Sequence, residues 1–147
     1  MQLASSAFQN NQNIPAKYTC DGENVGPPLQ IDGVPADAKS LALIMDDPDA
    51  PAGTWVHWVL WNIRPDIREI AKGVDPPGAM RGMTSFGTPG YGGPCPPSGE
   101  HHYIFKLYAL DQILNLPDST DAAALRTAIA GHILDQVELT GLYSRQR

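Results

Sequence analysis

The strongest pattern in this chain is a set of short apolar runs bounded by turn-forming residues. Each run is rich in β-branched and aromatic residues, which is typical of strands in a buried sheet. Three runs are strong enough to predict core strands: Ser40–Met45, Trp55–Ile63 and Tyr103–Leu110. Weaker strand candidates are Ala4–Phe8, Leu29–Ile31 and Val137–Thr140.

The periodicity changes between Pro117 and Gln136, where apolar residues recur at three- and four-residue steps. Asp118–Asp121 offers several N-cap candidates just before this segment. We therefore predict one helix here, carried by Leu125, Ala128, Ile129, His132 and Ile133. A chain of 147 residues suits a single domain over 1–147, a mainly β sandwich of two sheets with a helix in its C-terminal half.

Fourteen glycines and fourteen prolines are clustered, most densely between Pro76 and Gly99. Proline removes backbone donors and glycine weakens helices, so this stretch is neither a helix nor a central strand. It contains four large apolar residues, Met80, Met83, Phe86 and Tyr91, which favour a packed loop over a disordered linker.

The charge balance narrows the classes of partner. Ten basic against sixteen acidic residues give a net charge of −6, which disfavours binding to nucleic acid. No apolar run is long enough to cross a bilayer, and no secretory signal is visible at Met1–Phe8. We therefore expect a cytoplasmic protein without integral membrane association. Cys20 and Cys95 are compatible with one disulfide or two thiols, and we expect free thiols.

Polar residues at the strand ends occur in pairs two residues apart. The pairs are Asp47 and Asp49, Trp55 and His57, and His101 and Tyr103. Residues two apart on a strand face the same side. If the three segments are neighbours, their side chains form one pocket at the strand ends.

This set of side chains suits an oxyanion. Imidazolium groups neutralise a phosphate, while nearby carboxylates raise the pKa of the histidines and orient their rings. The glycine-rich stretch from Gly87 to Pro94 adds backbone N–H groups that bind anions in a nest. A local positive patch is then sufficient in an acidic protein.

Two other chemistries use the same residues. Cys95, His101 and Asp47 form a possible nucleophilic triad, although the chain has no G-x-S-x-G elbow or other nucleophile signature. His57, His101 and Asp47 are also a chemically reasonable facial triad for a metal, but the spacing lacks an H-E-x-x-H motif. Each residue taken alone also has an ordinary structural role, such as a capping turn. We therefore predict no enzymatic activity, no metal and no cofactor.

Several motifs together resemble the phosphatidylethanolamine-binding protein family, also called Raf kinase inhibitor-like proteins, and especially its short bacterial and archaeal branch. The motifs are Asp47-Pro-Asp-Ala-Pro51, Trp55-Val-His57, Gly90-Tyr-Gly-Gly-Pro-Cys-Pro-Pro97 and His101-His-Tyr103. The similarity extends over essentially the whole chain.

The resemblance implies a β-sandwich with a large central sheet, a smaller sheet and a small anion pocket at one end. By motif, the ligand-binding residues would be Asp47, Asp49, Trp55, His57, Gly92, Gly93, Pro94, His101 and Tyr103. The implied function is binding of a small phosphorylated or anionic ligand; the alternative is inhibition of a serine protease or kinase through protein interaction. A homodimer fits either reading.

Overall fold

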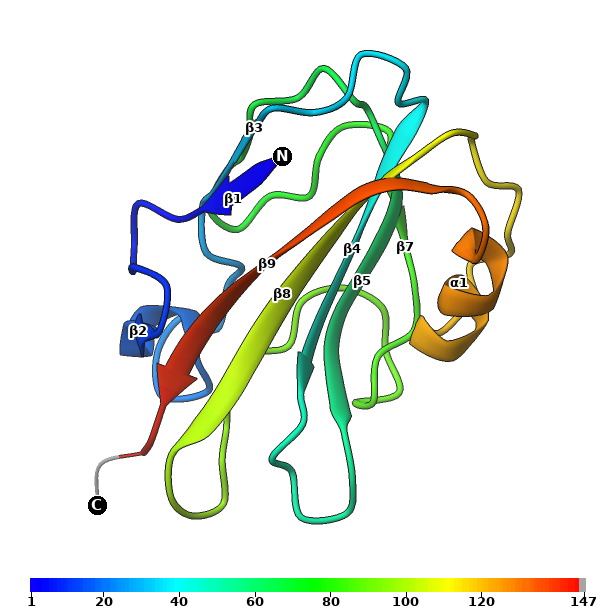
Figure 1. Cartoon of the computed structure of the whole chain (residues 1–147). Coiled ribbons are helices and arrows are strands. Elements are labelled where there is room, and N and C mark those ends of the chain that lie inside the picture. Colours follow the sequence, from blue (N-terminus) through cyan, green and yellow to red (C-terminus); the bar gives the residue numbers. More distant parts are fainter. Residues whose placement is uncertain (146–147) are drawn as a thin grey trace.

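The computed structural model describes residues 1–145 and forms a two-sheet sandwich with one α-helix (Figure 1). Eleven elements follow one another along this described part of the chain. They are β1 (Gln2–Ala4), β2 (Gln12–Asn13), a 3₁₀ turn (Ala16–Tyr18), β3 (Leu29–Asp32), β4 (Ser40–Asp47), β5 (Trp55–Ile63), β6 (Glu69–Ile70), β7 (Met80–Arg81), β8 (His101–Leu110), α1 (Ala122–Ile129) and β9 (Ile133–Tyr143).

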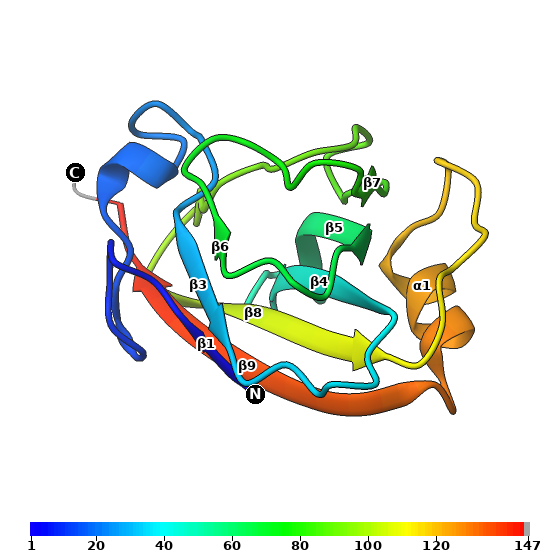
Figure 2. The ribbon, with the colours of Figure 1, turned by 90° about the horizontal axis from the view of Figure 1, so that it is seen from above.

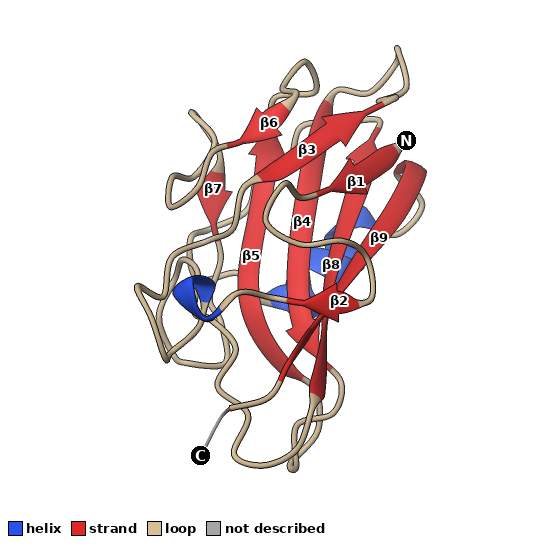
Figure 3. Ribbon diagram, turned by 90° about the vertical axis from the view of Figure 1, so that its left-hand side faces the viewer, coloured by secondary structure: helices blue, strands red, loops and turns tan. Residues whose placement is uncertain are grey.

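The large sheet has the strand order β2-β9-β8-β4-β5-β7, and the small sheet has the order β1-β3-β6. All pairings are antiparallel except that of β2 with β9. Figure 3 shows the small sheet lying across one face of the large one. The four long strands β4, β5, β8 and β9 therefore form the scaffold that positions the rest.

Successive side chains along these strands point to opposite faces of the large sheet, so the strands contribute to two separate hydrophobic cores. On β4, Leu41, Leu43 and Met45 face the core beneath the small sheet, while Ala42 and Ile44 face the core beneath α1. Figure 2 shows the small sheet and α1 at different sides of the large sheet. Because both faces of the large sheet are covered here, β4 is buried along its whole length. Its residues 41–45 accordingly form a continuous apolar run.

The three predicted core strands are confirmed, as is the mainly β sandwich class. The weaker predictions are correct in part. β3 lies where we expected it, β9 is much longer than Val137–Thr140, and the first strand is β1 rather than Ala4–Phe8.

The predicted helix is confirmed but ends earlier than the periodicity indicated. Asp121 caps it, since its side chain accepts a hydrogen bond from the Ala124 N–H. Gly131 then adopts a positive φ of 82° and turns the chain, and Ile133 pairs with Leu110 as the first residue of β9.

The expectation of free thiols is wrong, because Cys20 and Cys95 form a disulfide. The fold packs the turn after Tyr18 against the loop before β8, which brings the two Cα atoms to 5.5 Å. Further bonds hold the same contact: the Tyr91 hydroxyl donates to the Tyr18 carbonyl, and the Cys20 N–H donates to the Pro94 carbonyl. The loop from Pro76 to Gly99 is thus a packed one, with β7 as a short edge strand within it.

Candidate functional site

The antiparallel pairing of β4 with β8 brings the first group of site residues together at the ends of these strands. β4 ends at Asp47 where β8 begins at His101, and Asp46 is registered opposite Ile104. Alternation then turns Asp47, His101 and Tyr103 to the face that carries the core under the small sheet. Their side chains meet at the end of this core, beside the β4–β5 loop.

A β-bulge brings His57 to the same place. Met45 is registered opposite Trp58 and Asp46 opposite Val56, so His57 is the extra residue in β5. Without it, His57 would continue the series of Val59 and Trp61, which face the helix-side core. The bulge therefore re-aims the imidazole toward Asp47 and His101, as bulges beside binding sites commonly do.

Asp47 and His101 form a buried pair. The Nδ1 of His101 lies 2.6 Å from Asp47 Oδ2, and both side chains are more than nine-tenths buried. The other carboxylate oxygen, Oδ1, accepts the N–H of Asp49 at 2.8 Å. Both oxygens of Asp47 are thus occupied, and Nε2 is the His101 nitrogen left for a ligand.

His57 is held by backbone rather than by a carboxylate. Its Nδ1 donates to the carbonyl of Gly92 at 2.7 Å, which leaves Nε2 as the nitrogen available to the cavity. Burial lowers the pKa of His57 below its ordinary value, and this outweighs the Gly92 carbonyl and Asp47, which raise it. Asp47 thus raises this pKa as we expected, but the net shift is downward because burial has the larger effect.

Aromatic rings fill the space around the two imidazoles. The Tyr103 ring stacks on His101 and meets His57 edge-on, with centroid distances of 6.4 Å and 5.3 Å. Burial raises the pKa of the Tyr103 hydroxyl, which is buried without a hydrogen-bond partner in the described part of the chain. Trp55 and Phe86 pack edge to face and remain about 38% and 45% exposed at the rim.

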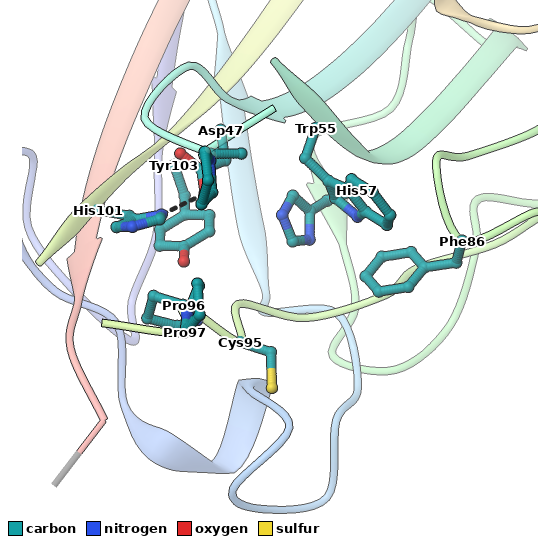
Figure 4. Close-up of a pocket in the computed structure, with 11 residues that line it drawn as sticks. Asp47, Trp55, His57, Phe86, Cys95, Pro96, Pro97, His101 and Tyr103 are labelled. Carbon is teal, nitrogen blue, oxygen red and sulfur yellow. Dashed lines mark hydrogen bonds and ion pairs between the residues drawn. The ribbon is translucent and has the colours of Figure 1, made fainter. Parts of the chain in front are cut away.

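The residues enclose a cavity of about 260 Å³ (Figure 4). Its size admits a phosphoryl group with a few further atoms rather than a drug-sized molecule. The polar lining side chains are Asp47, His57, His101 and Tyr103, and apolar side chains form most of the wall. The lining residues are Asp47, Ala50, Pro51, Trp55, His57, Phe86, Cys95, Pro96, Pro97, His101 and Tyr103.

Comparison with known proteins gives a consistent result. Residues 4–144 match the family model described as phosphatidylethanolamine-binding protein. A UPF0098 protein of Methanothermobacter thermautotrophicus is 50% identical, with 99% of each chain covered. A crystal structure of a phosphatidylethanolamine-binding protein homologue from Chlamydia trachomatis superimposes with a TM-score of 0.95 at 40% identity, covering 99% of this chain and 97% of the other. E. coli YBCL, described as a member of the mammalian PEBP family, gives a TM-score of 0.90 at 31% identity, covering 99% and 98%.

The chain belongs to the phosphatidylethanolamine-binding protein (PEBP) family. The fold expected from the family resemblance is thereby confirmed. Of the nine site residues predicted for this PEBP, five line the cavity: Asp47, Trp55, His57, His101 and Tyr103.

The other four predicted residues of the PEBP site do not line the cavity. Asp49 accepts both the N–H and the Nδ1 hydrogen bond of His102 at the surface. The Gly92 N–H donates to the His57 carbonyl, and the Gly93 N–H donates to Asn24 Oδ1. These amides are therefore engaged within the protein and do not form a ready anion nest. Pro94 is buried, and its carbonyl accepts from Cys20.

Glycine at positions 92 and 93 is explained by close packing rather than by anion binding. A Cβ at Gly92 would lie 2.3 Å from the Phe86 ring, and one at Gly93 would lie 2.4 Å from Asn24 Oδ1. Both positions need close approach of a neighbour to the backbone. The pair therefore supports the site by letting Phe86 and Asn24 pack closely around it.

Six lining residues of the PEBP cavity were not among our nine ligand-binding candidates, although Cys95 was considered as a nucleophile. They are Ala50, Pro51, Phe86, Cys95, Pro96 and Pro97. All six lie in the two loops beside the predicted pairs, where their apolar character indicated packing but not which surface they pack against. Within residues 1–145, no three His, Cys, Asp or Glu side chains gather into a metal-binding group, and no helix is both long and apolar enough to span a membrane.

Proposed function

We propose that this PEBP is a non-enzymatic binding protein whose cavity takes a small anionic or phosphoryl-bearing ligand. One observation carries the proposal. Two buried imidazoles, His57 and His101, stand on the same cavity, and each has its Nδ1 engaged by the protein and its Nε2 left over. When protonated, two imidazole N–H groups on one small cavity can both donate to the oxygens of a single tetrahedral anion.

The chemistry of the neighbouring sulfur supports binding rather than catalysis. A nucleophilic cysteine needs a free thiolate. The sulfur of Cys95 is bonded to Cys20, so the Cys95-His101-Asp47 alternative lacks its nucleophile in this state. The cavity is also lined mainly by apolar side chains, which hold a ligand without attacking it.

A second candidate function is inhibition of a serine protease or kinase, in the manner implied by the name Raf kinase inhibitor-like. The exposed rim of Trp55 and Phe86 favours it, because exposed aromatic side chains are common anchors in protein interfaces. A protease panel separates the two functions. Inhibition that survives His57→Ala would place the inhibitory surface outside the cavity.

Assembly and location are further proposals. We propose a homodimer, which sedimentation analysis tests directly. We also propose a cytoplasmic location, for which the Cys20–Cys95 disulfide creates a competing hypothesis, since disulfides are uncommon in most cytosols although frequent in hyperthermophiles. Fractionation of the source cells with an antibody against the protein distinguishes the compartments.

Titration with inorganic phosphate while recording the histidine ring signals by NMR tests the binding function. We expect the His57 and His101 signals to move together and saturate. His57→Ala should weaken phosphate binding about ten- to a hundredfold, the effect of losing one charge-assisted hydrogen bond. The matched control is His132→Ala, because His132 forms an exposed pair with Asp111 far from the cavity lining. Signals of both cavity histidines that stay unmoved at millimolar phosphate would refute the proposal.

A further inference from the structure

The charge of the cavity does not by itself match an anion. Among the lining residues within the described range 1–145, the ionisable side chains are Asp47, His57, His101 and Tyr103, with no lysine or arginine. With both imidazoles neutral, the formal charge of the wall is −1. If His101 is protonated, its charge and that of Asp47 cancel. In neither state does the wall offer net positive charge to a ligand.

Backbone and side-chain donors do not make up the difference. The N–H groups of Gly92 and Gly93 are used within the protein, and Pro96 and Pro97 have no N–H to give. The Tyr103 hydroxyl and the Trp55 indole N–H are the remaining side-chain donors among the lining residues, and both are uncharged. An anion in a small, mainly apolar cavity needs charge compensation, because isolated charge is costly where water is excluded.

His57 is the group in a position to supply the missing charge. Its Nδ1 donates to the Gly92 carbonyl whether the ring is neutral or charged, so the neutral ring presents a bare Nε2 lone pair to the cavity. Figure 4 shows the ring standing across the cavity from the Asp47–His101 pair. A lone pair repels an anion, whereas a proton at Nε2 turns the same atom into a charged donor.

The surroundings of His57 determine when that proton is present. Titratable and charged groups face it from each neighbouring element: Asp47 and, through the sheet, Asp46 on β4, and His101 and Tyr103 on β8. The carbonyls of Gly92 and Gly93 lie on the loop side, and the uncharged rings of Phe86 and Trp55 close the rim. Asp46 already carries two cations, Lys106 and Arg126. Burial among these groups keeps the ring neutral near pH 7 in the absence of ligand.

We propose that the cavity binds an anion only together with a proton that is taken up at Nε2 of His57. This inference rests on the proposed anion-binding function and adds a ligand rule to it. The preferred ligand class is an oxyanion that carries a proton or arrives with one, such as a singly charged phosphomonoester. Binding and protonation reinforce each other, so affinity rises as pH falls.

Inorganic sulfate is the decisive probe because it does not itself titrate between about pH 5 and 8. Any pH dependence of its affinity therefore comes from the protein. For the wild-type protein we expect the Kd for sulfate to rise about tenfold per pH unit above the pKa of His57, since one proton is bound with each anion. Calorimetry across this range measures the slope.

Three variants show which residue causes the pH dependence of the sulfate affinity. His57→Gln keeps a donor but cannot be protonated, so it should bind sulfate with no pH slope. His101→Gln should bind more weakly but keep the slope. His132→Gln, the control outside the site, should behave as wild type. The proposal of proton uptake at His57 would be overturned by a pH dependence that persists in His57→Gln. It would also be overturned by wild-type sulfate binding that is equal at all pH values.

A second readout does not depend on any variant. The ¹⁵N signals of the His57 ring in the wild-type protein should shift from the neutral to the charged form when saturating sulfate is added near pH 7. A ring that stays neutral in the complex refutes the rule while leaving anion binding intact. If neither sulfate nor phosphate binds at any pH, the proposed function itself fails.

Discussion

Asp46 and Asp47 are neighbours at the end of β4, equally buried, yet they point to opposite faces of the large sheet and have different surroundings. Asp46 Oδ2 accepts from Lys106 Nζ at 3.0 Å and from Arg126 Nη2 at 2.8 Å. Asp47 Oδ2 lies 2.6 Å from the imidazole of His101. The first carboxylate is bound to a lysine and an arginine, and the second to an imidazole.

The difference shows what separates a structural carboxylate from one in a binding site. The cations on Asp46 join β8 and α1 to β4, and Asp46 lines none of the cavity described above. The partner of Asp47, His101, has a second nitrogen that Asp47 does not engage, and its ring lines a cavity. Burial and charge are the same for both residues, so the geometry of the partner decides the role.

The two faces are also held together by different means. On the helix face, ion pairs at Asp46 fix α1. On the cavity face, the Cys20–Cys95 disulfide and the Tyr91–Tyr18 hydrogen bond fix the loop that forms the wall. Damage to one face should therefore affect stability alone, whereas damage to the other should affect both stability and ligand binding.

The largest effect is expected from removing the disulfide. The double variant Cys20→Ser and Cys95→Ser should lose about 4 kcal/mol of unfolding free energy, because the bond closes a loop with a sequence separation of 75 residues. It should also weaken phosphate binding, because Cys95, Pro96 and Pro97 form part of the cavity wall. Urea denaturation and phosphate titration measure the two effects.

Chemical reduction of the wild-type protein is the matched control for this double variant. It breaks the same bond without changing the sequence, so both samples should show the same midpoint of unfolding. Phosphate affinity that is unaffected in both samples would mean that hydrogen bonds alone fix the wall, and the proposed difference between the faces would be wrong.

The next effect is expected at Asp46. Asp46→Ala should cost about 3 kcal/mol of unfolding free energy, at the lower end of the range for breaking a buried ion pair. The loss stays at that end because Lys106 and Arg126 are partly exposed and keep access to water. Thermal and urea unfolding measure it. The sulfate affinity should change little at a pH low enough for His57 to be protonated.

Asp47→Asn gives the opposite pattern and completes the test. We expect a smaller loss of stability, about 2 kcal/mol for one charge-assisted bond to His101. Anion binding should change strongly, because Asn can offer its N–H to the ring and reverse the tautomer that leaves Nε2 to the ligand. Equal effects of the two variants on binding would contradict the separation of the faces.

Most of the fold could be predicted from the chain because its long strands are buried on one or both faces. Ser40–Met45 and Trp55–Ile63 are mostly apolar, as in a covered sheet, and the structure buries the first fully and most of the second. The two-residue strands β2, β6 and β7 could not be predicted, since so few residues carry no periodicity. The disulfide depends on a contact between segments 75 residues apart, which local patterns do not contain.

The site residues could be predicted only where the alternation of side chains along a strand decides which face they are on. The spacing of His101 and Tyr103 placed both correctly on one face of β8. The spacing of Trp55 and His57 also gave the right result, but the bulge that turns them toward the cavity is set by register against β4 and is invisible in one strand. The lowered pKa of His57 follows from burial by loop residues such as Phe86, which pair spacing does not reveal.

The smallest effect is expected at Asp49, which tests whether the edge of the site behaves as surface. Hydrogen bonds from the backbone and ring of His102 lower the pKa of Asp49, so its charge stabilises the fold above about pH 4 and that contribution is lost as pH falls through the lowered pKa. The pair is exposed, with 40% of the Asp49 side chain accessible, so Asp49→Asn should cost less than about 1 kcal/mol near pH 7.

Urea unfolding from pH 2 to 7 measures the difference, which should vanish at the acid end because wild-type Asp49 is then also neutral. Asn keeps an acceptor for the His102 N–H, so the variant isolates the charge. Parallel stability curves for the two proteins down to the lowest pH would show that the charge of Asp49 contributes nothing, and that this end of the β4–β5 loop is held by Asp47 and the backbone alone.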